Sequence, residues 1–262
     1  MTHKLFDIEG KKAIVTGGTR GLGKGMAEGL MEAGVEVCIV GTKERGSKDH
    51  PGAIDVAEEF TQRGFKCHGV AADLGSLELG EVAFKKCLEV LGGDLDILVV
   101  AHGIQRRHPS NEFPADDWHD VIGTNLDSVF GMARPASDLF KNKGYGKIIL
   151  IASMCSWFGG KTVPAYSAAK GGVAQLAKGM SNDLIGYGVN INAIAPGYMA
   201  TDMNEALLNP ENPRYKELTD RIPAHRWGTG QDMKGCCIFL ASHASDYLGG
   251  AVIPVDGGYL VM

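Results

Sequence analysis

Short apolar segments alternate with longer segments of mixed polarity along most of the chain. The apolar segments have the length and β-branched content of buried strands, and they lie at 12–17, 35–41, 66–74, 95–103, 146–153, 189–197 and 250–258. Between them, apolar positions recur every three or four residues, which predicts helices at 24–33, 53–63, 80–91, 116–141, from about Tyr166 onward, and at 231–242. The two periods therefore divide the chain into alternating strands and helices.

This alternation predicts an α/β fold: a single Rossmann-type, doubly wound parallel sheet with helices on both faces and right-handed crossovers. The segment 95–103 is almost continuously apolar, as expected for a strand covered on both faces. No repeat, low-complexity run or linker interrupts the pattern, so we expect one dinucleotide-binding catalytic domain over 1–262. The proline-punctuated segment at about 198–228 is typical of a lid over a substrate site.

Composition and charge mainly argue against certain partners and sites: nucleic acid, a membrane and a metal ion. The 262 residues are 44% apolar and 22% charged with a net charge of −5, and no basic run favours nucleic acid or a membrane surface as a partner. No apolar run approaches the roughly 18 residues that span a bilayer, and the charged, glycine-broken start lacks a secretory pattern. The six cysteines show neither CxxC pairs nor zinc-like spacing with histidine, so we expect buried thiols, no metal and a cytoplasmic protein.

A glycine-rich stretch, TGGTRGLG at 16–23, directly follows the first predicted strand. Its glycines permit a sharp turn and let backbone N–H groups approach a pyrophosphate at the start of the next helix. The spacing, G-x-x-x-G-x-G, differs from the usual dinucleotide fingerprint, and the alternative is an ordinary strand-to-helix turn. Its place in a βαβ unit favours nucleotide binding, with contacts expected at Gly17, Thr19, Arg20, Gly21, Leu22 and Gly23.

Charges near the second predicted strand bear on which nicotinamide cofactor binds. An NAD site usually carries an acidic residue at the end of that strand, where this chain reads Val-Gly-Thr-Lys at 40–43. Arg20, Lys43 and Arg45 are able to neutralise a 2′-phosphate, and the alternative is that they are ordinary solvated cations. We therefore expect NADP(H), with NAD(H) as the alternative. Asp73 is placed either to accept a hydrogen bond from the adenine amino group or to form a turn or helix cap.

The motif YSAAK at 166–170 places a phenol and an ammonium on one face of a predicted helix. A free tyrosine with a pKa near 10 is a poor acid–base catalyst at neutral pH, and the ammonium of Lys170 is expected to lower that pKa. Taken alone, such a pair is commonly a surface feature. Ser153, at the end of a predicted strand, is positioned to hold a substrate oxygen beside Tyr166. Asn125 lies in the long helical segment, where an asparagine marks a bend or holds a water.

The chain resembles the short-chain dehydrogenase/reductase superfamily along nearly its whole length, through TGGTRGLG, AADL, TNLDSVF, IAS, YSAAK, NAIAPG and the terminal VDGG. The resemblance implies that Tyr166 is the general acid/base, that Ser153 orients the reacting oxygen, and that Lys170 binds the nicotinamide ribose and tunes Tyr166. It also implies a water held by Asn125 in a proton relay, a homotetramer and no metal. The cofactor contacts expected beyond the glycine loop are Thr42, Asp73, Leu74, Gly103, Tyr166, Lys170, Pro196, Gly197 and Thr201.

One departure from the family pattern follows the fourth predicted strand. The family normally reads N-N-A-G, where this chain has Val100, Ala101, His102 and Gly103. His102 is able to contact cofactor or substrate, but a packed structural histidine is the favoured interpretation.

Substrate specificity is expected in loops beyond the carboxyl ends of the strands. Arg106, Arg107 and Arg226 are candidates for holding a carboxylate, and the alternative for each is a solvated cation or an intersubunit salt bridge. Trp157 and Tyr198 are further candidates. The stretches GIQRR, RIPAHRWG and SMCSWFGG resemble the branch that contains 2-deoxy-D-gluconate 3-dehydrogenase and 2-dehydro-3-deoxy-D-gluconate 5-dehydrogenase, which implies a sugar-acid substrate.

We therefore expect reversible hydride transfer between a nicotinamide and a secondary alcohol or ketone of a sugar acid. One alternative is a carbonyl reductase for a bulkier ketone, such as a 3-oxoacyl thioester or an aromatic polyketide, with Trp157, Phe158 and Tyr198 forming a stacking pocket. The other is a nucleotide-sensing protein without turnover, which would not need the serine, tyrosine and lysine together.

Overall fold

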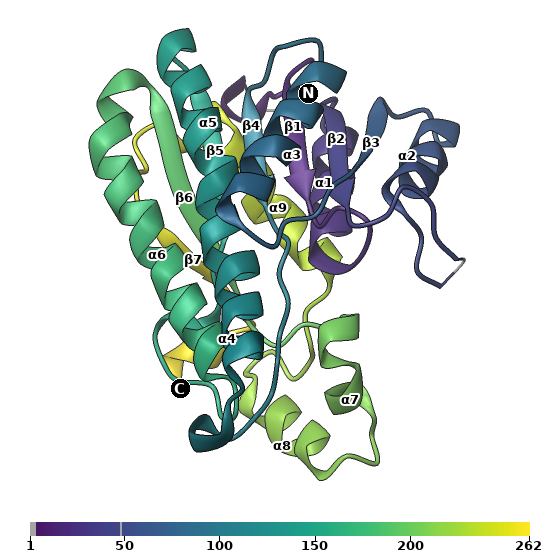
Figure 1. Cartoon of the computed structure of the whole chain (residues 1–262), viewed down its shortest axis with the longest axis vertical. Coiled ribbons are helices and arrows are strands. Elements are labelled where there is room, and N and C mark those ends of the chain that lie inside the picture. Colours follow the sequence, from purple (N-terminus) through teal and green to yellow (C-terminus); the bar gives the residue numbers. More distant parts are fainter. Residues whose placement is uncertain (1–3, 48) are drawn as a thin grey trace.

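A sheet of seven parallel strands forms the centre of the molecule in the computed structural model, which describes residues 4–47 and 49–262 (Figure 1). The strand order is β3-β2-β1-β4-β5-β6-β7. The strands are β1 (Lys12–Thr16), β2 (Glu36–Gly41), β3 (Cys67–Ala71), β4 (Ile97–Val100), β5 (Gly146–Ile151), β6 (Val189–Pro196) and β7 (Val252–Val255). The parallel, doubly wound α/β fold predicted from the alternation of strands and helices is confirmed.

Helices cover both faces of this sheet (Figure 1). They are α1 (Gly21–Glu32), α2 (Ala53–Gln62), α3 (Leu77–Val90), α4 (Ala115–Ile122), α5 (Ser128–Lys143), α6 (Pro164–Leu184), α7 (Glu205–Leu208), α8 (Pro213–Arg221) and α9 (Gly230–Ala241). Short 3₁₀ turns lie at Lys4–Phe6, Ser110–Glu112, Met154–Ser156, Ile185–Tyr187, Asp202–Asn204, His243–Ser245 and Tyr259–Val261. Helices α3, α5 and α6 pack on one face, and α1, α2 and α9 pack on the other.

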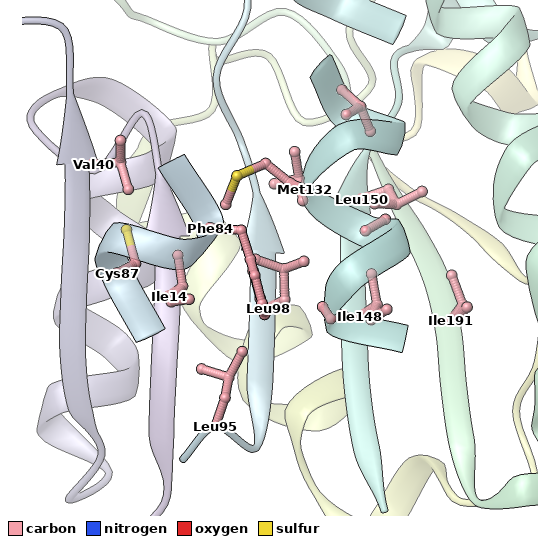
Figure 2. Close-up of a cluster of buried hydrophobic side chains, with 14 of the residues drawn as sticks. Ile14, Val40, Phe84, Cys87, Leu95, Leu98, Met132, Ile148, Leu150 and Ile191 are labelled. Carbon is pink, nitrogen blue, oxygen red and sulfur yellow. The ribbon is translucent and has the colours of Figure 1, made fainter. Parts of the chain in front are cut away.

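Two apolar cores lie on opposite faces of the sheet because successive side chains of a strand point to opposite sides. In β1, Ile14 enters one core and Val15 enters the other. Figure 2 shows the first core, in which Phe84 of α3 and Met132 of α5 lie over Leu98 of the central strand β4. Since the central strands are buried on both faces, they form a rigid platform for the loops at their ends.

The carboxyl ends of the strands carry the loops that the sequence singled out. The glycine loop follows β1, His102 and Gly103 follow β4, Ser153 follows β5, and Gly197 follows β6. In Figure 1, α7 and α8 lie at this end of the sheet, beyond the helical layers that flank it. The expected functional residues therefore meet at one edge of the sheet.

The largest difference from the predicted elements concerns the helix expected over 116–141. The structure divides it into α4 and α5, joined by a π-helical turn at Gly123–Asp127 that contains Asn125. The backbone N–H of Ser128 donates to the carbonyl of Gly123, five residues earlier, instead of to the fourth. The periodicity of apolar residues did not reveal this local widening of the helix.

Two smaller differences concern element ends and the segment 198–228. Strand β4 stops at Val100, well before the predicted end at 103, because the N–H of Ala101 leaves the ladder and donates to the side chain of Thr16 at 2.9 Å. The segment 198–228, in which the sequence pattern predicted no helix, contains the helices α7 and α8. Both features depend on contacts with distant parts of the chain.

Candidate active site

The glycine loop between β1 and α1 has the shape of an anion cradle. Gly17 and Gly21 adopt positive φ angles of 65° and 54°, and a Cβ atom on Gly17 would lie 3.0 Å from the backbone of His102. Helix α1 begins at Gly21, and its N-cap residue, Arg20, makes no side-chain cap. No acidic side chain lies in its first turn, so its N–H groups and the positive end of the helix dipole suit a pyrophosphate.

Part of the segment after β6 lies beside the same loop. The Cγ2 atom of Thr201 lies 3.4 Å from the position of a Cβ on Gly21. Gly197 packs so closely on Asp256 that a Cβ would approach the Asp256 Cα to 2.6 Å. The structure thus brings Thr201 beside the glycine loop, as its assignment to the cofactor site requires, while Gly197 lies against the turn after β7.

The cations considered for a 2′-phosphate differ in their surroundings. Arg45 is paired with Asp55 at 3.0 Å and with Glu58 at 2.5 Å, so the chain itself neutralises this guanidinium. Arg20 is largely exposed and lies 3.3 Å from Asp202. Exposed pairs of this kind are weak and exchange readily for another anion. Arg20 is therefore the better candidate of the two arginines for a phosphate contact, and Lys43, which is exposed just after β2, stays a candidate as well.

The side chain of Asp73 serves a turn in this structure. Its Oδ1 atom accepts a hydrogen bond from the N–H of Gly75 at 3.0 Å, while the residue remains exposed. Leu74 is buried, and Thr42 is exposed just after β2. A contact between Asp73 and adenine stays a prediction alongside this turn-forming role.

Ser153, Tyr166 and Lys170 come together where β5 ends and α6 begins. Lys170 is buried, and its Nζ donates to the carbonyl of Ile151 at 2.6 Å and lies 5.8 Å from the centre of the Tyr166 ring. The hydroxyl of Ser156 donates to the carbonyl of Lys170 at 2.7 Å, which ties the loop after Ser153 to α6. Ser153 itself is buried, and its Oγ accepts from the N–H of Cys155 at 3.1 Å.

Opposing effects act on the pKa of Tyr166. Burial raises it to about 12, while the hydrogen bond with Ser153 and the charge of Arg107 lower it and Cys155 raises it further. Burial also lowers the pKa of Lys170 to about 8. The expectation that Lys170 sets a low pKa for Tyr166 does not hold in this structure, because burial outweighs the lowering groups and Nζ is turned towards the Ile151 carbonyl.

Asn125 uses its whole side-chain amide to hold the backbone of Ile104. Its Oδ1 accepts from the Ile104 N–H and its Nδ2 donates to the Ile104 carbonyl, both at 2.8 Å, and the side chain is fully buried. A Cβ atom on Gly103 would lie 3.2 Å from Asn125 Oδ1 and 3.9 Å from Lys170 Nζ. Asn125, Gly103 and Lys170 therefore border one small space, and glycine keeps it open.

His102 is a packed histidine, as the sequence favoured. It is 8% exposed, with Nδ1 at 2.7 Å from Thr16 Oγ1 and Nε2 at 2.6 Å from Ser128 Oγ. Burial lowers its pKa to about 3, with a further lowering from the charge of Lys170. The imidazole is therefore neutral at physiological pH.

The three arginine candidates for the substrate lie in different settings. Arg106 pairs with Asp117 at 3.4 Å and Asp120 at 3.5 Å, and Arg226 forms a forked pair with Asp232 at 2.6 and 2.9 Å. Arg107 is exposed, and its charge acts on Tyr166. Arg107 is thus the candidate whose charge acts on the Tyr166 phenol, while a substrate role for any of the three arginines stays a prediction.

Aromatic side chains lie at the same edge. Trp157 is 51% and Phe158 37% exposed, whereas Tyr198 is half-buried, with ring centres 5.2 Å from Trp227 and 5.3 Å from Tyr259. The contact between Tyr259 and Tyr198 could not be predicted from the sequence, because no local pattern links two residues so far apart in the chain. The role of Ser128, which bonds to His102, was missed for the same reason.

Over residues 4–47 and 49–262, no His, Cys, Asp or Glu side chains form a group of three suited to a metal ion. In the same described residues, every helix is too short or too polar to traverse a lipid bilayer. The cysteines of this part of the chain are all unpaired thiols, of which Cys155 and Cys236 are only partly buried.

A glycine cradle at the first strand of a parallel sheet, beside a serine, a tyrosine and a lysine at a strand end, defines the class of nicotinamide-dependent dehydrogenases and reductases. A family model described as enoyl-(acyl carrier protein) reductase matches residues 17–260. The chain belongs to the short-chain dehydrogenase/reductase family.

Particular relatives are similar over the whole length. The chain is 42% identical over 261 residues to 2-dehydro-3-deoxy-D-gluconate 5-dehydrogenase of Dickeya dadantii (strain 3937) and 43% identical to the enzyme of that name from Escherichia coli (strain K12). Each match covers 99% of both chains. A solved structure of gluconate 5-dehydrogenase from Burkholderia cenocepacia J2315 in complex with NADP and tartrate is 37% identical, with a TM-score of 0.91 and coverage of 99% of this chain and 98% of that one.

Proposed function

We propose that the protein is an NADP(H)-dependent oxidoreductase that interconverts a secondary alcohol and a ketone of a sugar acid. The observation that carries this proposal is the meeting of Ser153, Tyr166 and Lys170 where β5 ends and α6 begins. Relatives at 42% and 43% identity that are named for a deoxygluconate support the substrate class.

A bound nicotinamide ring would supply or accept the hydride, and the proton is the task of the protein. In the direction of reduction, the phenol of Tyr166 gives its proton to the substrate oxygen, and the hydroxyl of Ser153 donates a hydrogen bond to the same oxygen. A pKa near 12 keeps Tyr166 protonated at neutral pH, which is the state that reduction needs. In the direction of oxidation, Arg107 and Ser153 favour the phenolate.

After Tyr166 has given its proton to the substrate, groups of the protein supply a new one. An ammonium has three donors, and the bond from Lys170 Nζ to Ile151 leaves two for the ribose hydroxyls of the cofactor. The side chain of Asn125 is fully engaged with Ile104, so we assign to its main chain the task of holding the relay water. This arrangement connects the buried phenol with solvent.

The cofactor proposal rests on the cradle and on charge. The expected contacts along Gly17–Gly23 fit a pyrophosphate, and Arg20 is free to exchange Asp202 for a 2′-phosphate. The Burkholderia relative was solved with NADP. We therefore assign NADP(H) as the preferred cofactor, with NAD(H) as the alternative.

For the substrate, we assign the carboxylate to Arg107, because the residue is exposed and its positive charge acts on Tyr166. The complex of the Burkholderia relative with tartrate, a hydroxy acid, accords with an acidic ligand. The segment 198–228 acts as a lid on a single catalytic domain over 1–262, with Tyr198 on its inner side. We further propose a homotetramer that works in the cytoplasm on a small-molecule substrate.

The test is a substrate panel assayed with NADPH and NADH in parallel, followed at the absorbance band of the reduced nicotinamide. Turnover of aldonates or keto-aldonates with a preference for NADPH is expected. A clear preference for NADH would overturn the cofactor assignment. Arg20→Glu is expected to weaken NADPH binding with little effect on NADH, and an equal loss for both would show that Arg20 is not selective.

A second candidate function is the reduction of a bulkier ketone. The exposed rings of Trp157 and Phe158 favour it, because they offer an apolar surface for an acyl chain or an aromatic substrate. The same panel separates the two functions when it includes a 3-oxoacyl thioester and aromatic ketones. Turnover of these compounds alone would replace the sugar-acid proposal.

A further inference from the structure

A chain of buried side-chain hydrogen bonds runs behind the proposed active site. It joins Thr16 at the end of β1, His102 after β4 and Ser128 at the start of α5, with distances of 2.7 and 2.6 Å. Thr16 and Ser128 are fully buried and His102 is 8% exposed. None of these three residues has a role in the mechanism proposed above.

The bonding partners fix the protonation of the imidazole. Thr16 Oγ1 accepts from the N–H of Ala101 at 2.9 Å and has one proton to give, which goes to Nδ1 of His102. Ser128 Oγ gives its proton to the carbonyl of Thr124 at 2.8 Å and so accepts from Nε2–H. The arrangement that satisfies every group therefore has a neutral ring protonated on Nε2.

Ser128 is the point at which this chain meets the π-helical turn. Its backbone N–H reaches back to Gly123, which leaves the carbonyl of Thr124 without the partner it would have in an α-helix. The Ser128 hydroxyl donates to that carbonyl, and the His102 ring both hydrogen-bonds to the Thr124 backbone and lies 2.6 Å from the hydroxyl through Nε2. His102 thus stabilises the turn that carries Asn125.

A second bond joins the same two segments on the side of the site. The side chain of Asn125 hydrogen-bonds to Ile104, two residues after His102: its Oδ1 accepts from the Ile104 N–H and its Nδ2 donates to the Ile104 carbonyl. Gly103 lies between these two anchor points and borders Asn125 and Lys170. Hydrogen bonds at both ends of the segment 102–104, from His102 to Ser128 and from Ile104 to Asn125, therefore join it to the π-helical turn.

We propose that His102 is a positioning residue, whose neutral imidazole holds the π-helical turn in the shape that places Asn125 for proton transfer. This inference rests on the proposed function of Asn125 in the relay. A displaced turn would move the relay water, whereas the glycine loop keeps its own hydrogen bond from the Gly18 N–H to the Val40 carbonyl at 3.2 Å. The consequence of losing the bond is a slower chemical step with little change in binding.

Two substitutions of His102 separate its two bonds. Glutamine places its amide near the position of Nε2 and still donates to Ser128, whereas asparagine places it near Nδ1 and does not reach Ser128. We expect His102→Asn to lower kcat by about tenfold, with the substrate KM and the NADPH Kd within about twofold of wild type. His102→Gln is expected to retain kcat within about threefold.

Substitutions in α5 provide a matched control. Ser128→Ala removes the link to Thr124 and is expected to lower kcat as His102→Asn does. Ser137→Ala removes another buried hydroxyl of α5, which donates to the Arg134 carbonyl, and is expected to leave kcat unchanged. Unchanged kcat in both His102→Asn and Ser128→Ala, or an equal loss in His102→Gln and His102→Asn, would overturn the proposal.

A spectroscopic readout is independent of turnover. The ¹⁵N spectrum of histidine-labelled wild-type protein, assigned by the signal missing from His102→Gln, is expected to show a neutral ring protonated on Nε2 at neutral pH. A charged ring or an Nδ1–H tautomer would overturn the proposal. The kcat of each variant is compared with that of wild type on whichever substrate the panel identifies. The comparison therefore remains valid even if the substrate is not a sugar acid. An unaltered kcat in Asn125→Ala, which removes both bonds to Ile104, would show that the position of the turn does not limit the chemical step, while the spectrum still tests the His102 bonds.

Discussion

Two opposing effects act on the protonation of the Tyr166 phenol: burial favours its neutral form, and nearby groups favour its charged form. Burial is the larger effect, and Ser153 and Arg107 act against it. The residue therefore rests as an acid at neutral pH and loses its proton when a substrate oxygen takes it or when added positive charge lies nearby. This balance at a single atom underlies the proposed chemistry.

Tyr166→Phe removes only this hydroxyl. We expect kcat to fall by about 10²–10⁴-fold, the usual contribution of general acid–base catalysis, while the NADPH Kd stays within about twofold. Steady-state kinetics and a fluorescence titration with NADPH measure the two quantities. Turnover at the wild-type rate would contradict the enzymatic proposal.

The low pKa of His102 predicts that the protein loses stability as the pH falls. Its pKa is about 3 in the folded protein and near 6.5 when unfolded, so the unfolded chain takes up a proton between these values and the folded chain does not. The contribution is fully present above about pH 6.5 and is lost as the pH falls towards 3. From about pH 6.5 to 4.5 it amounts to about 2–3 kcal/mol of unfolding free energy.

Urea unfolding of wild type and His102→Gln at these two pH values measures this effect. The variant lacks the titrating group, so its unfolding free energy is expected to decline less on acidification. The control is His119→Gln, which removes an exposed histidine. An identical acid dependence in wild type and His102→Gln would contradict the low pKa of His102.

At the scale of elements, the segment 198–228 is joined to the C-terminal turn by a small apolar cluster. Tyr259 is 3% exposed, and its ring lies 5.3 Å from that of Tyr198, 6.1 Å from that of Phe158 and 4.4 Å from the guanidinium of Arg221. The same cluster includes Met154, which follows the proposed catalytic serine. One side chain near the chain end therefore connects α8, the loop after β5 and the start of the lid.

Tyr259→Ala is expected to loosen this lid. The substrate KM should rise by about tenfold and amide exchange over 198–228 should accelerate, because the ring packing that holds the segment is removed, while the NADPH Kd stays within about twofold. Hydrogen–deuterium exchange and steady-state kinetics are the measurements. Tyr259→Phe keeps the ring and Tyr247→Ala removes a fully exposed one, and both should behave as wild type. Unaltered exchange in Tyr259→Ala would contradict the anchoring role.

At the scale of the whole molecule, the two edges of the sheet carry different kinds of polar residue. The carboxyl edge holds the proposed active site and exposed ion pairs, whereas ion pairs with a buried partner, Asp96 or Lys147, occupy the amino edge. There, the fully buried Lys147 donates to Asp246 at 2.6 Å and to Asn190 at 2.8 Å, which ties β5 to β6 and to the turn before β7. Asp96 accepts from the N–H of Lys12 at 2.9 Å and joins the starts of β1 and β4. Stability and function are therefore separated along the strands.

Asp246→Asn leaves the buried Lys147 ammonium without its carboxylate. We expect a loss of about 2 kcal/mol in unfolding free energy, seen as a fall of about 4–8 °C in melting temperature. Kinetic constants should be unchanged, since the pair lies at the opposite edge from the site. Asp220→Asn is the control, because it breaks an exposed pair with Lys216 and should alter the melting temperature by about 1 °C or less. Equal melting temperatures for the two variants would contradict the structural role of the buried pair.

The sequence by itself determined the parallel sheet, the glycine loop at the first strand end and the placing of Tyr166 and Lys170 on one helix face. These features follow from local chain geometry, since strand and helix periods and the carboxyl-edge rule need only the order of residues. The histidine at 102 was also foreseen as a packed residue.

Only the tertiary structure decided how these residues are charged and partnered. It turned Lys170 towards the Ile151 carbonyl, raised the pKa of Tyr166 by burial, and opened a helix into a π-helical turn at Asn125. It also engaged Arg106 with acidic residues of α4 while leaving Arg107 exposed. Burial, hydrogen-bond partners and charge pairing depend on segments far apart in the chain, and no local pattern of residues encodes their distances.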